Sequence, residues 1–264
     1  GPLQNQPSDA RPFGRNLQQP TTKFDVSGDV LRTQLAVAGK QVQLRNVSVE
    51  GDATIKETSA LAAGQSPLHI SGEFVHVTGA DSPQARAVVA GEPAIVSGRG
   101  ISLKGRSIHL DRAQNRVTIP GVGEATLPLA GLTQSRSPQN QALAQARFAT
   151  HRVSDPQTVP SASNSTESAL VTWQDGLQFD GQTIQVRGQV EAKTDQQRLR
   201  APLVEIGLTQ RIDLSQAPRD ASVDIRDVRL TGQVMMENRS MVGGELTSID
   251  EMMVKDLTID QQTG

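Results

Sequence analysis

Apolar and polar residues alternate in short runs through most of the chain, most regularly between residues 95 and 129. Alternation at a period of two places one side of a strand on an apolar face and the other in water. The breaks between these runs, at residues 104–106 and 111–116, are too short for crossover helices. The pattern therefore predicts antiparallel strands joined as hairpins. The three runs are Ile101 with Leu103, Ile108 with Leu110, and Val117 with Ile119.

A short phrase recurs along the chain: an apolar residue, a small or polar one, a glycine and a further residue that is usually polar. Its glycines lie 21 to 26 positions apart in the first half and 44 apart in the second. A step of this size holds about two strands, which predicts stacked β units that contact mainly their neighbours. The alternative is chance repetition of a phrase common in β proteins. The glycines are Gly28, Gly51, Gly72, Gly98, Gly121, Gly188 and Gly232.

The patterning divides the chain into four segments. Residues 1–22 are rich in Gln, Asn, Pro and Arg, which predicts a disordered leader. Residues 23–132 and 169–264 carry the two sets of β units. Between them, residues 133–168 contain a piece around residues 140–150 that could be helical and continue as a Pro/Ser/Asn/Thr tract. Two interpretations of this segment stand: a flexible linker between domains, or a long loop inserted in one continuous sheet.

The two ends of the chain suggest a piece of a longer protein. The start at Gly1-Pro2 is typical of a cleaved fusion tag, so a natural leader or anchor could have been removed. The last residues read as a strand running into a turn. We therefore expect a fragment whose second half is truncated at the C-terminus.

Composition narrows the fold and the possible partners. Of 264 residues 36% are hydrophobic, but only six are aromatic, so small aliphatic side chains must pack thin layers of sheet. The net charge is -2, whereas nucleic-acid-binding proteins usually carry an excess of basic residues, so we expect no nucleic acid partner. The absence of cysteine excludes disulfides and thiolate metal sites. No apolar run approaches the roughly 20 residues that span a bilayer.

No constellation typical of catalysis or of metal or cofactor binding is present in the sequence. His69 and His76 are predicted on opposite faces of a strand, and His109 and His151 are isolated. Asp111 lies in a turn, where we expect it to bond local backbone. No nucleophile elbow, P-loop or dinucleotide fingerprint occurs. We therefore predict a protein that is not an enzyme, without catalytic residues, metal or cofactor.

Residues 98–129, 170–208 and 228–260 resemble units of the OstA-like family, which includes the periplasmic lipopolysaccharide-transport proteins LptA and LptC and the periplasmic part of LptD. The family's units run as a strand, an F-x-G turn, a G-x-V strand, a polar turn and a strand introduced by a small residue. Here these elements are Phe179-Asp180-Gly181, Gly188-Gln189-Val190, residues 194–197 and residues 199–201. The resemblance covers most of residues 24–132 and 169–264.

This resemblance implies an all-β, half-open β-jellyroll, also called a β-taco, in which two antiparallel sheets face each other. The groove between them would hold acyl chains of lipopolysaccharide or a similar lipid. It further implies the periplasm or cell envelope of a diderm bacterium, and other β-jellyroll modules as partners by end-to-end strand addition. The chain departs from the family in the 133–168 insertion, in its length and in showing no membrane anchor.

The leading hypothesis is a non-enzymatic lipid-binding and bridging module, and the alternative is a structural β-repeat scaffold without a lipid ligand. A β-solenoid carbohydrate enzyme would require a cluster of acidic residues on one face, which the sequence does not show. For the inward residues, the alternative to a lipid groove is an ordinary closed core. The groove candidates are Ile101, Leu103, Ile108, Leu110, Val117, Ile119, Phe179, Ile184, Val186 and Val190.

Overall fold

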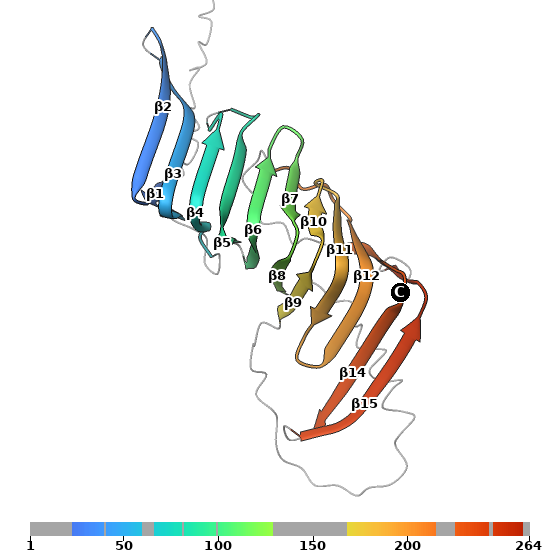
Figure 1. Cartoon of the computed structure of the whole chain (residues 1–264). Helices are drawn as coiled ribbons and strands as arrows, with labels where there is room; N and C mark the ends of the chain where they lie inside the picture. Colours follow the sequence, from blue (N-terminus) through green and yellow to red (C-terminus); the bar gives the residue numbers. More distant parts are fainter. Residues whose placement is uncertain are drawn as a thin grey trace, which may run out of the picture.

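The computed structural model describes residues 23–39, 41–59, 66–80, 82–98, 100–128, 168–214, 225–242 and 245–260. Within these ranges every regular element is a β-strand, and all sixteen strands belong to one hydrogen-bonded system. The strands follow one another side by side from the blue end of the molecule to the red end (Figure 1). The predicted all-β class is confirmed. The predicted leader, the candidate helix near residue 145 and residues 133–167 lie outside the described residues.

All strand pairs are antiparallel, as the short connections predict. The first eight strands are β1 (Phe24–Ser27), β2 (Val30–Ala38), β3 (Gln41–Glu57), β4 (His69–Thr78), β5 (Arg86–Gly98), β6 (Ile101–Asp111), β7 (Arg116–Pro120) and β8 (Gly123–Pro128). The last eight are β9 (Ser168–Trp173), β10 (Gly176–Phe179), β11 (Thr183–Lys193), β12 (Gln197–Leu208), β13 (Ile225–Thr231), β14 (Val234–Val242), β15 (Glu245–Val254) and β16 (Leu257–Asp260).

Long strands change partners halfway along their length, which divides the sheet into two leaves. The first half of β3 pairs with β2 and its second half with β1. Likewise β6 pairs first with β8 and then with β7, and β12 pairs first with β14 and then with β13. We call the leaf that contains β2, β7, β10, β13 and β16 leaf A, and the leaf that contains β1, β8, β9, β14 and β15 leaf B. The line where they meet is the crease, and the opposite ends are the rims.

Register shifts mark the crease in the long strands. They fall between Glu50 and Ala53 of β3, between Ser71 and Phe74 of β4, and between Ala90 and Ala94 of β5. A bulge of this kind bends a strand sharply, so one strand can belong to both leaves. One hydrophobic cluster then contains residues of both leaves.

Six of the strands close a ring in the middle of the molecule. Its order is β6, β7, β10, β11, β9 and β8, and the remaining strands extend from it on both sides. Pro128 of β8 pairs with Ser168 of β9, so the chain leaves one strand and returns on its neighbour. The two predicted halves of the chain therefore share one sheet.

The recurring glycines mark the crease, with one exception. Gly28, Gly51, Gly72, Gly121, Gly188 and Gly232 all lie at junctions between the leaves, whereas Gly98 ends β5. Four of the six have positive φ angles, between 71° and 94°, which favour glycine. The repeat therefore records successive passages of the chain through the crease.

One sequence prediction about the central stretch is wrong. Residues 104–106 do not separate two strands, because β6 is continuous from Ile101 to Asp111. The break in alternation is the point where β6 crosses from leaf B to leaf A. A Cβ atom on Gly105 would lie 2.5 Å from Cγ2 of Ile119 in leaf A, so glycine lets the two leaves approach.

Candidate functional site

Inward aliphatic residues form a row across leaf A, with one residue from each strand. Neighbours in the row are register partners, except that Ile108 and Ile119 lie one position beyond the His109–Thr118 pair. Between the ends of the row, every member is at most 9% exposed. Leu31 at the first strand is 55% exposed, although it lies directly beside Val49, which is fully buried. The row is Leu31, Val49, Val75, Val89, Ile108, Ile119, Leu177, Val186, Val204, Leu230 and Leu257.

Leaf B carries a matching row, whose central members, apart from Ala192, belong to the same cluster or pack against it. Its two end residues are again exposed: Val26 at 40% and Met252 at 45%. The apolar interior therefore reaches the surface at both ends of the molecule. The row is Val26, Ile55, Ile70, Val96, Leu103, Ala125, Val171, Ala192, Leu199, Met236 and Met252.

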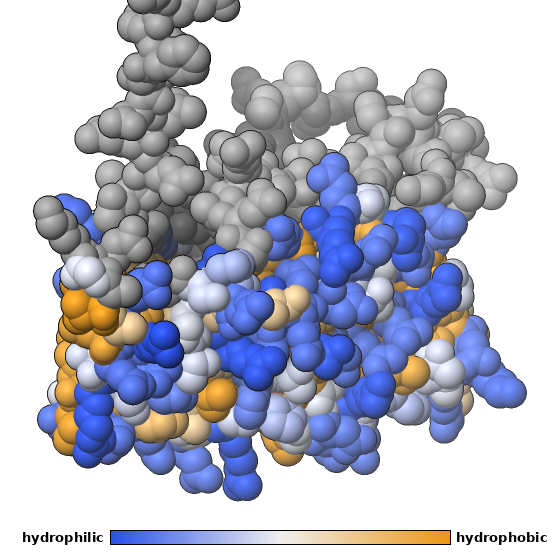
Figure 2. Space-filling model, turned by 90° about the horizontal axis from the view of Figure 1, so that it is seen from above, coloured by the Kyte–Doolittle hydropathy of each residue, from blue (hydrophilic) through white to orange (hydrophobic). Residues whose placement is uncertain are grey.

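The N-terminal end carries the larger exposed apolar patch. Figure 2 shows it as the orange area at the left-hand end of the molecule. Its side chains belong to the first three strands and are between 38% and 70% exposed. We call this group the N-terminal patch. It consists of Phe24, Val26, Val30, Leu31, Leu35, Val37 and Val42.

The crease is lined by small residues and by the single tryptophan. Ala53, Ala94 and Gly123 are buried there, and Trp173 lies directly opposite Gly123 on the neighbouring strand. A Cβ atom on Gly123 would lie 2.4 Å from Cζ2 of the indole. Trp173 is 1% exposed, and its Nε1 has no hydrogen-bond partner in the described part of the protein. The interior at the crease is thus tightly closed.

A short segment closes the rim of leaf A. Residues 209–214 leave the end of β12 and run across the β10–β11 and β6–β7 turns, and we call them the strap. The Nδ2 of Asn115 donates to the carbonyl of Ile212 at 2.6 Å, and its Oδ1 accepts from the amide of Leu214 at 2.7 Å. The amide of Ile212 also donates to the carbonyl of Gly181 at 2.7 Å. The side chains of Ile212 and Leu214 pack against the hydrophobic cluster, so the strap covers the cluster at the rim of leaf A.

Asn115 is a residue that sequence reasoning missed. It is 7% exposed and has a φ of 53°, a backbone conformation that asparagine tolerates better than most residues. In the sequence it is one polar residue among several in the turn between Asp111 and Arg116. Its partners are almost 100 positions away, so no local signal could identify them.

Nine of the ten groove candidates lie in the interior between the leaves. Six are buried in the hydrophobic cluster: Ile108, Val117, Ile119, Phe179, Val186 and Val190. Three are partly buried and pack against it: Leu103, Leu110 and Ile184. Ile101, at the rim end of β6, is 38% exposed. In the middle of the molecule these side chains fill the space between the leaves.

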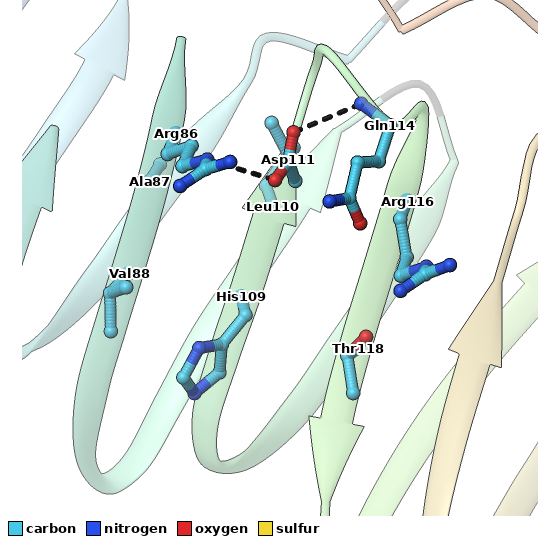
Figure 3. A pocket seen from close by; sticks show the side chains of 9 residues that line it. All are labelled: Arg86, Ala87, Val88, His109, Leu110, Asp111, Gln114, Arg116 and Thr118. Atoms are coloured by element: carbon cyan, nitrogen blue, oxygen red, sulfur yellow. Dashed lines mark hydrogen bonds and ion pairs between the residues drawn. The ribbon is translucent and has the colours of Figure 1, made fainter. Parts of the chain in front are cut away.

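The outer face of leaf A carries a shallow hollow of about 250 Å³ across β5, β6 and β7 (Figure 3). The Nε of Arg86 lies 2.9 Å from Oδ2 of Asp111, and the amide of Gln114 donates to Oδ1 of Asp111 at 3.0 Å. The predicted backbone contact of Asp111 is confirmed. His109 in the same hollow lies 3.1 Å from the hydroxyl of Ser107. The Asp111 carboxylate is thus engaged in a cross-strand ion pair and a turn.

Several charged groups elsewhere on the surface form ion pairs across neighbouring strands, whereas Asp227 and Glu237 pair within their own strands. Burial opposes ionisation of Glu191, but its hydrogen bonds with Arg198 and Arg200 outweigh this, so the pKa of Glu191 is lowered. Among the described residues, no group of three or more His, Asp or Glu side chains could hold a metal ion. Nor does the described part of the chain contain a helix long and apolar enough to cross a membrane.

Comparison of the chain with family models, with curated proteins and with solved structures finds no match in any of the three.

Proposed function

We propose that this protein is a non-enzymatic lipid-binding and bridging module, in which acyl chains lie along the inner rows of the two leaves. The observation that carries the proposal is the continuity of these rows. Each row passes through every strand of its leaf and reaches solvent at the N-terminal end, at Leu31 and Val26. In an ordinary closed core, the outermost strands would shield the last apolar residues from water. Here the apolar rows end in exposed residues, which favours their contact with a lipid or with a neighbouring module.

Lipid uptake requires the leaves to separate, because the central inner residues are almost fully buried. Each CH₂ group transferred from water gains about 0.8 kcal/mol, so an acyl chain of about a dozen such groups gains on the order of 10 kcal/mol. That gain is large enough to offset the loss of contacts between the leaves along part of their length. The strap is the part of the rim that would have to move, since Ile212 and Leu214 cover the interior there.

The bent strands and the crease support a half-open β-jellyroll as the finer description of the fold. In this proposal lipopolysaccharide or a similar acylated lipid is the ligand, and the periplasm or cell envelope of a diderm bacterium is the location. The edge strands β1, β2, β15 and β16 would add to those of other β-jellyroll modules end to end. These expectations rest on the sequence resemblance together with the two-leaf arrangement.

A structural scaffold without a ligand is the second candidate. The observation that favours it is the closed interior: Val49, Ile119 and Val234 are completely buried, and Trp173 fills the crease. In this case the exposed ends serve only for assembly, and the leaves never separate.

Photo-crosslinking separates the two functions. A photoreactive residue replaces Ile108 or Val186, which face the interior, and in control proteins it replaces the outward-facing neighbours His109 or Arg187. After incubation with lipids from a diderm envelope, we expect lipid adducts from the two interior positions only, and co-purified lipid in native mass spectrometry. Adducts from neither interior position, with no lipid in the native spectra, would exclude the lipid function and leave the scaffold.

A further inference from the structure

Within each leaf, the edge strand at the N-terminal end and the edge strand at the C-terminal end run in the same direction. In the described residues each leaf contains eleven strands or half-strands, all antiparallel. In an antiparallel sheet with an odd number of strands, the first and last strands are parallel. Thus β1 and β15 both run towards the crease in leaf B, and β2 and β16 both run away from it in leaf A.

This parity decides how two copies can join. Head-to-tail stacking would place β15 beside β1 and β16 beside β2, and both contacts would pair parallel strands. A two-fold axis along the crease-to-rim direction at the N-terminal end instead places β2 beside β1 of the second copy. These strands run in opposite directions, so the contact continues the antiparallel pattern of the whole molecule. Such an interface closes on itself as a dimer.

The inward and outward faces of β1 and β2 are compatible with this pairing. Leu31 and Val26 are both members of the inner rows, so a register that sets one opposite the other joins the rows of the two copies. The same register sets Arg32 on the outer face opposite Asp25 of the second copy. Because the axis is two-fold, this ion pair would occur twice. The Arg32 side chain is 61% exposed. Within its own chain it contacts Glu50 of β3, which lies on the side of β2 opposite to the free edge.

The opposite end of the molecule does not favour association with itself. Its edge strands β15 and β16, with the turn between them, carry Asp250, Glu251, Asp256 and Asp260 against Lys255. A two-fold contact there that set Leu257 opposite Met252 would place Asp260 of one copy diagonal to Glu251 of the other, and these like charges would be destabilising. Among the described residues, the N-terminal end exposes seven large apolar side chains against five at the opposite end. Its edge strands also carry charges of both signs, Asp25 and Arg32, so it is the self-complementary end.

We propose that two copies of this chain form a two-fold dimer through β1 and β2, with Leu31 against Val26 and Arg32 against Asp25 across the interface. The proposal rests on the end-to-end association proposed above and specifies which ends meet. It requires no bound lipid, so its failure leaves the lipid function standing, and failure of the lipid function leaves the dimer standing.

Oxidative cross-linking of lipid-free protein tests which ends meet, because the 264-residue chain has no cysteine. An equimolar mixture of Val26→Cys and Leu31→Cys chains should give a covalent dimer. A mixture of Val26→Cys and Met252→Cys chains, which reports head-to-tail contact of the leaf B rows, should give none. Cross-linking of the second mixture but not the first would overturn the proposal, as would its absence from both.

Charge exchange tests the register in sedimentation velocity experiments. Asp25→Lys and Arg32→Glu each create two repulsive contacts per dimer, so each variant alone should dimerise about tenfold more weakly. Their mixture should recover the dimer, since a mixed dimer contains two attractive pairs. Asp195→Lys, an exposed turn substitution away from the edge, is the charge-matched control and should dimerise normally. A monomer at all concentrations, or oligomers of the natural chain that keep growing beyond a dimer, would contradict the two-fold interface.

Discussion

The close approach of Trp173 and Gly123 at the crease gives the sharpest test of how the leaves are held together. The φ angle of Gly123 lies outside the left-handed region, so its backbone accepts an alanine without strain. The substitution Gly123→Ala would gain about 0.4–1 kcal/mol from the reduced freedom of the unfolded chain. However, the new Cβ would lie 2.4 Å and 2.7 Å from two indole atoms and 2.8 Å from the carbonyl oxygen of Lys104.

These neighbours have little room to move, since the indole is rigid and 1% exposed and the carbonyl belongs to the backbone. Overpacking of a dense core costs about 1–3 kcal/mol, so we expect a net loss of about 1–2 kcal/mol in the free energy of unfolding. For a chain of this size that corresponds to a Tm lower by about 2–4 °C for each kcal/mol. Trp173 is the only tryptophan and the chain has no tyrosine, so fluorescence during thermal or urea unfolding reports on this site alone.

A double-mutant cycle decides whether the clash is the cause. In a Trp173→Leu background the indole is absent and only the carbonyl oxygen of Lys104 stays close to the new Cβ, so Gly123→Ala should cost clearly less than in the parent chain. Because this background also lacks the only tryptophan, the unfolding of all four proteins of the cycle is followed by far-ultraviolet circular dichroism. Gly121→Ala is the matched control, because no atom lies within 4 Å of the Cβ that it adds. Its loss of stability comes from the backbone φ of 72°, which disfavours alanine, and should be the same in both backgrounds. If Gly123→Ala is harmless in the natural chain, or equally costly in both backgrounds, the argument for close approach is refuted.

Three further predictions concern the strap, a turn and the crossing in β6. Asn115→Gly accepts the positive φ but removes the two side-chain hydrogen bonds of Asn115 to the strap. We expect the free energy of unfolding to fall by about 1–3 kcal/mol and hydrogen exchange at the Leu214 amide to become faster. Unchanged exchange would show that Asn115 does not hold the strap. Hydrogen bonds from the backbone amides of Gln182 and Thr183 lower the pKa of Asp180, so the carboxylate stabilises the fold above the ordinary value of 3.8 and stops doing so as the pH falls through the lowered pKa. Asp180→Asn should reduce the acid dependence of stability by well under 1 kcal/mol in urea unfolding at different pH values, and an unaltered pH profile would contradict this. Gly105→Ala should cost about 1 kcal/mol, less than Gly123→Ala, because only Cγ2 of Ile119 lies closer than 3.0 Å to the new Cβ, whereas three atoms do so at Gly123. An equal or larger loss of Tm would contradict this ranking.

Much of the interior was accessible from local pattern alone. Alternation identifies which side of a strand is apolar, and nine of the ten residues chosen in this way face the hydrophobic cluster. Ile101 is the exception because exposure depends on how far a residue lies from the crease, which alternation does not reveal. The glycine phrase is visible as a repeat, but a glycine in a hairpin turn and a glycine at a bend within a strand look the same in the sequence. The pattern therefore predicts a break at Gly105, which in the structure lies within β6.

The strand class, the apolar side of each strand and most of the glycines at the crease depend on a few neighbouring residues, so they can be read from the sequence. The bending of the strands into two leaves, the pairing of β8 with β9 and the contact of Asn115 with the strap depend on distant residues and emerge only in the folded chain. These features join residues up to about 100 positions apart, and their energy comes from packing and hydrogen bonds that exist only once both partners are in place. The direction of the edge strands belongs to the same group, since it follows from the number of strands that pair in each leaf.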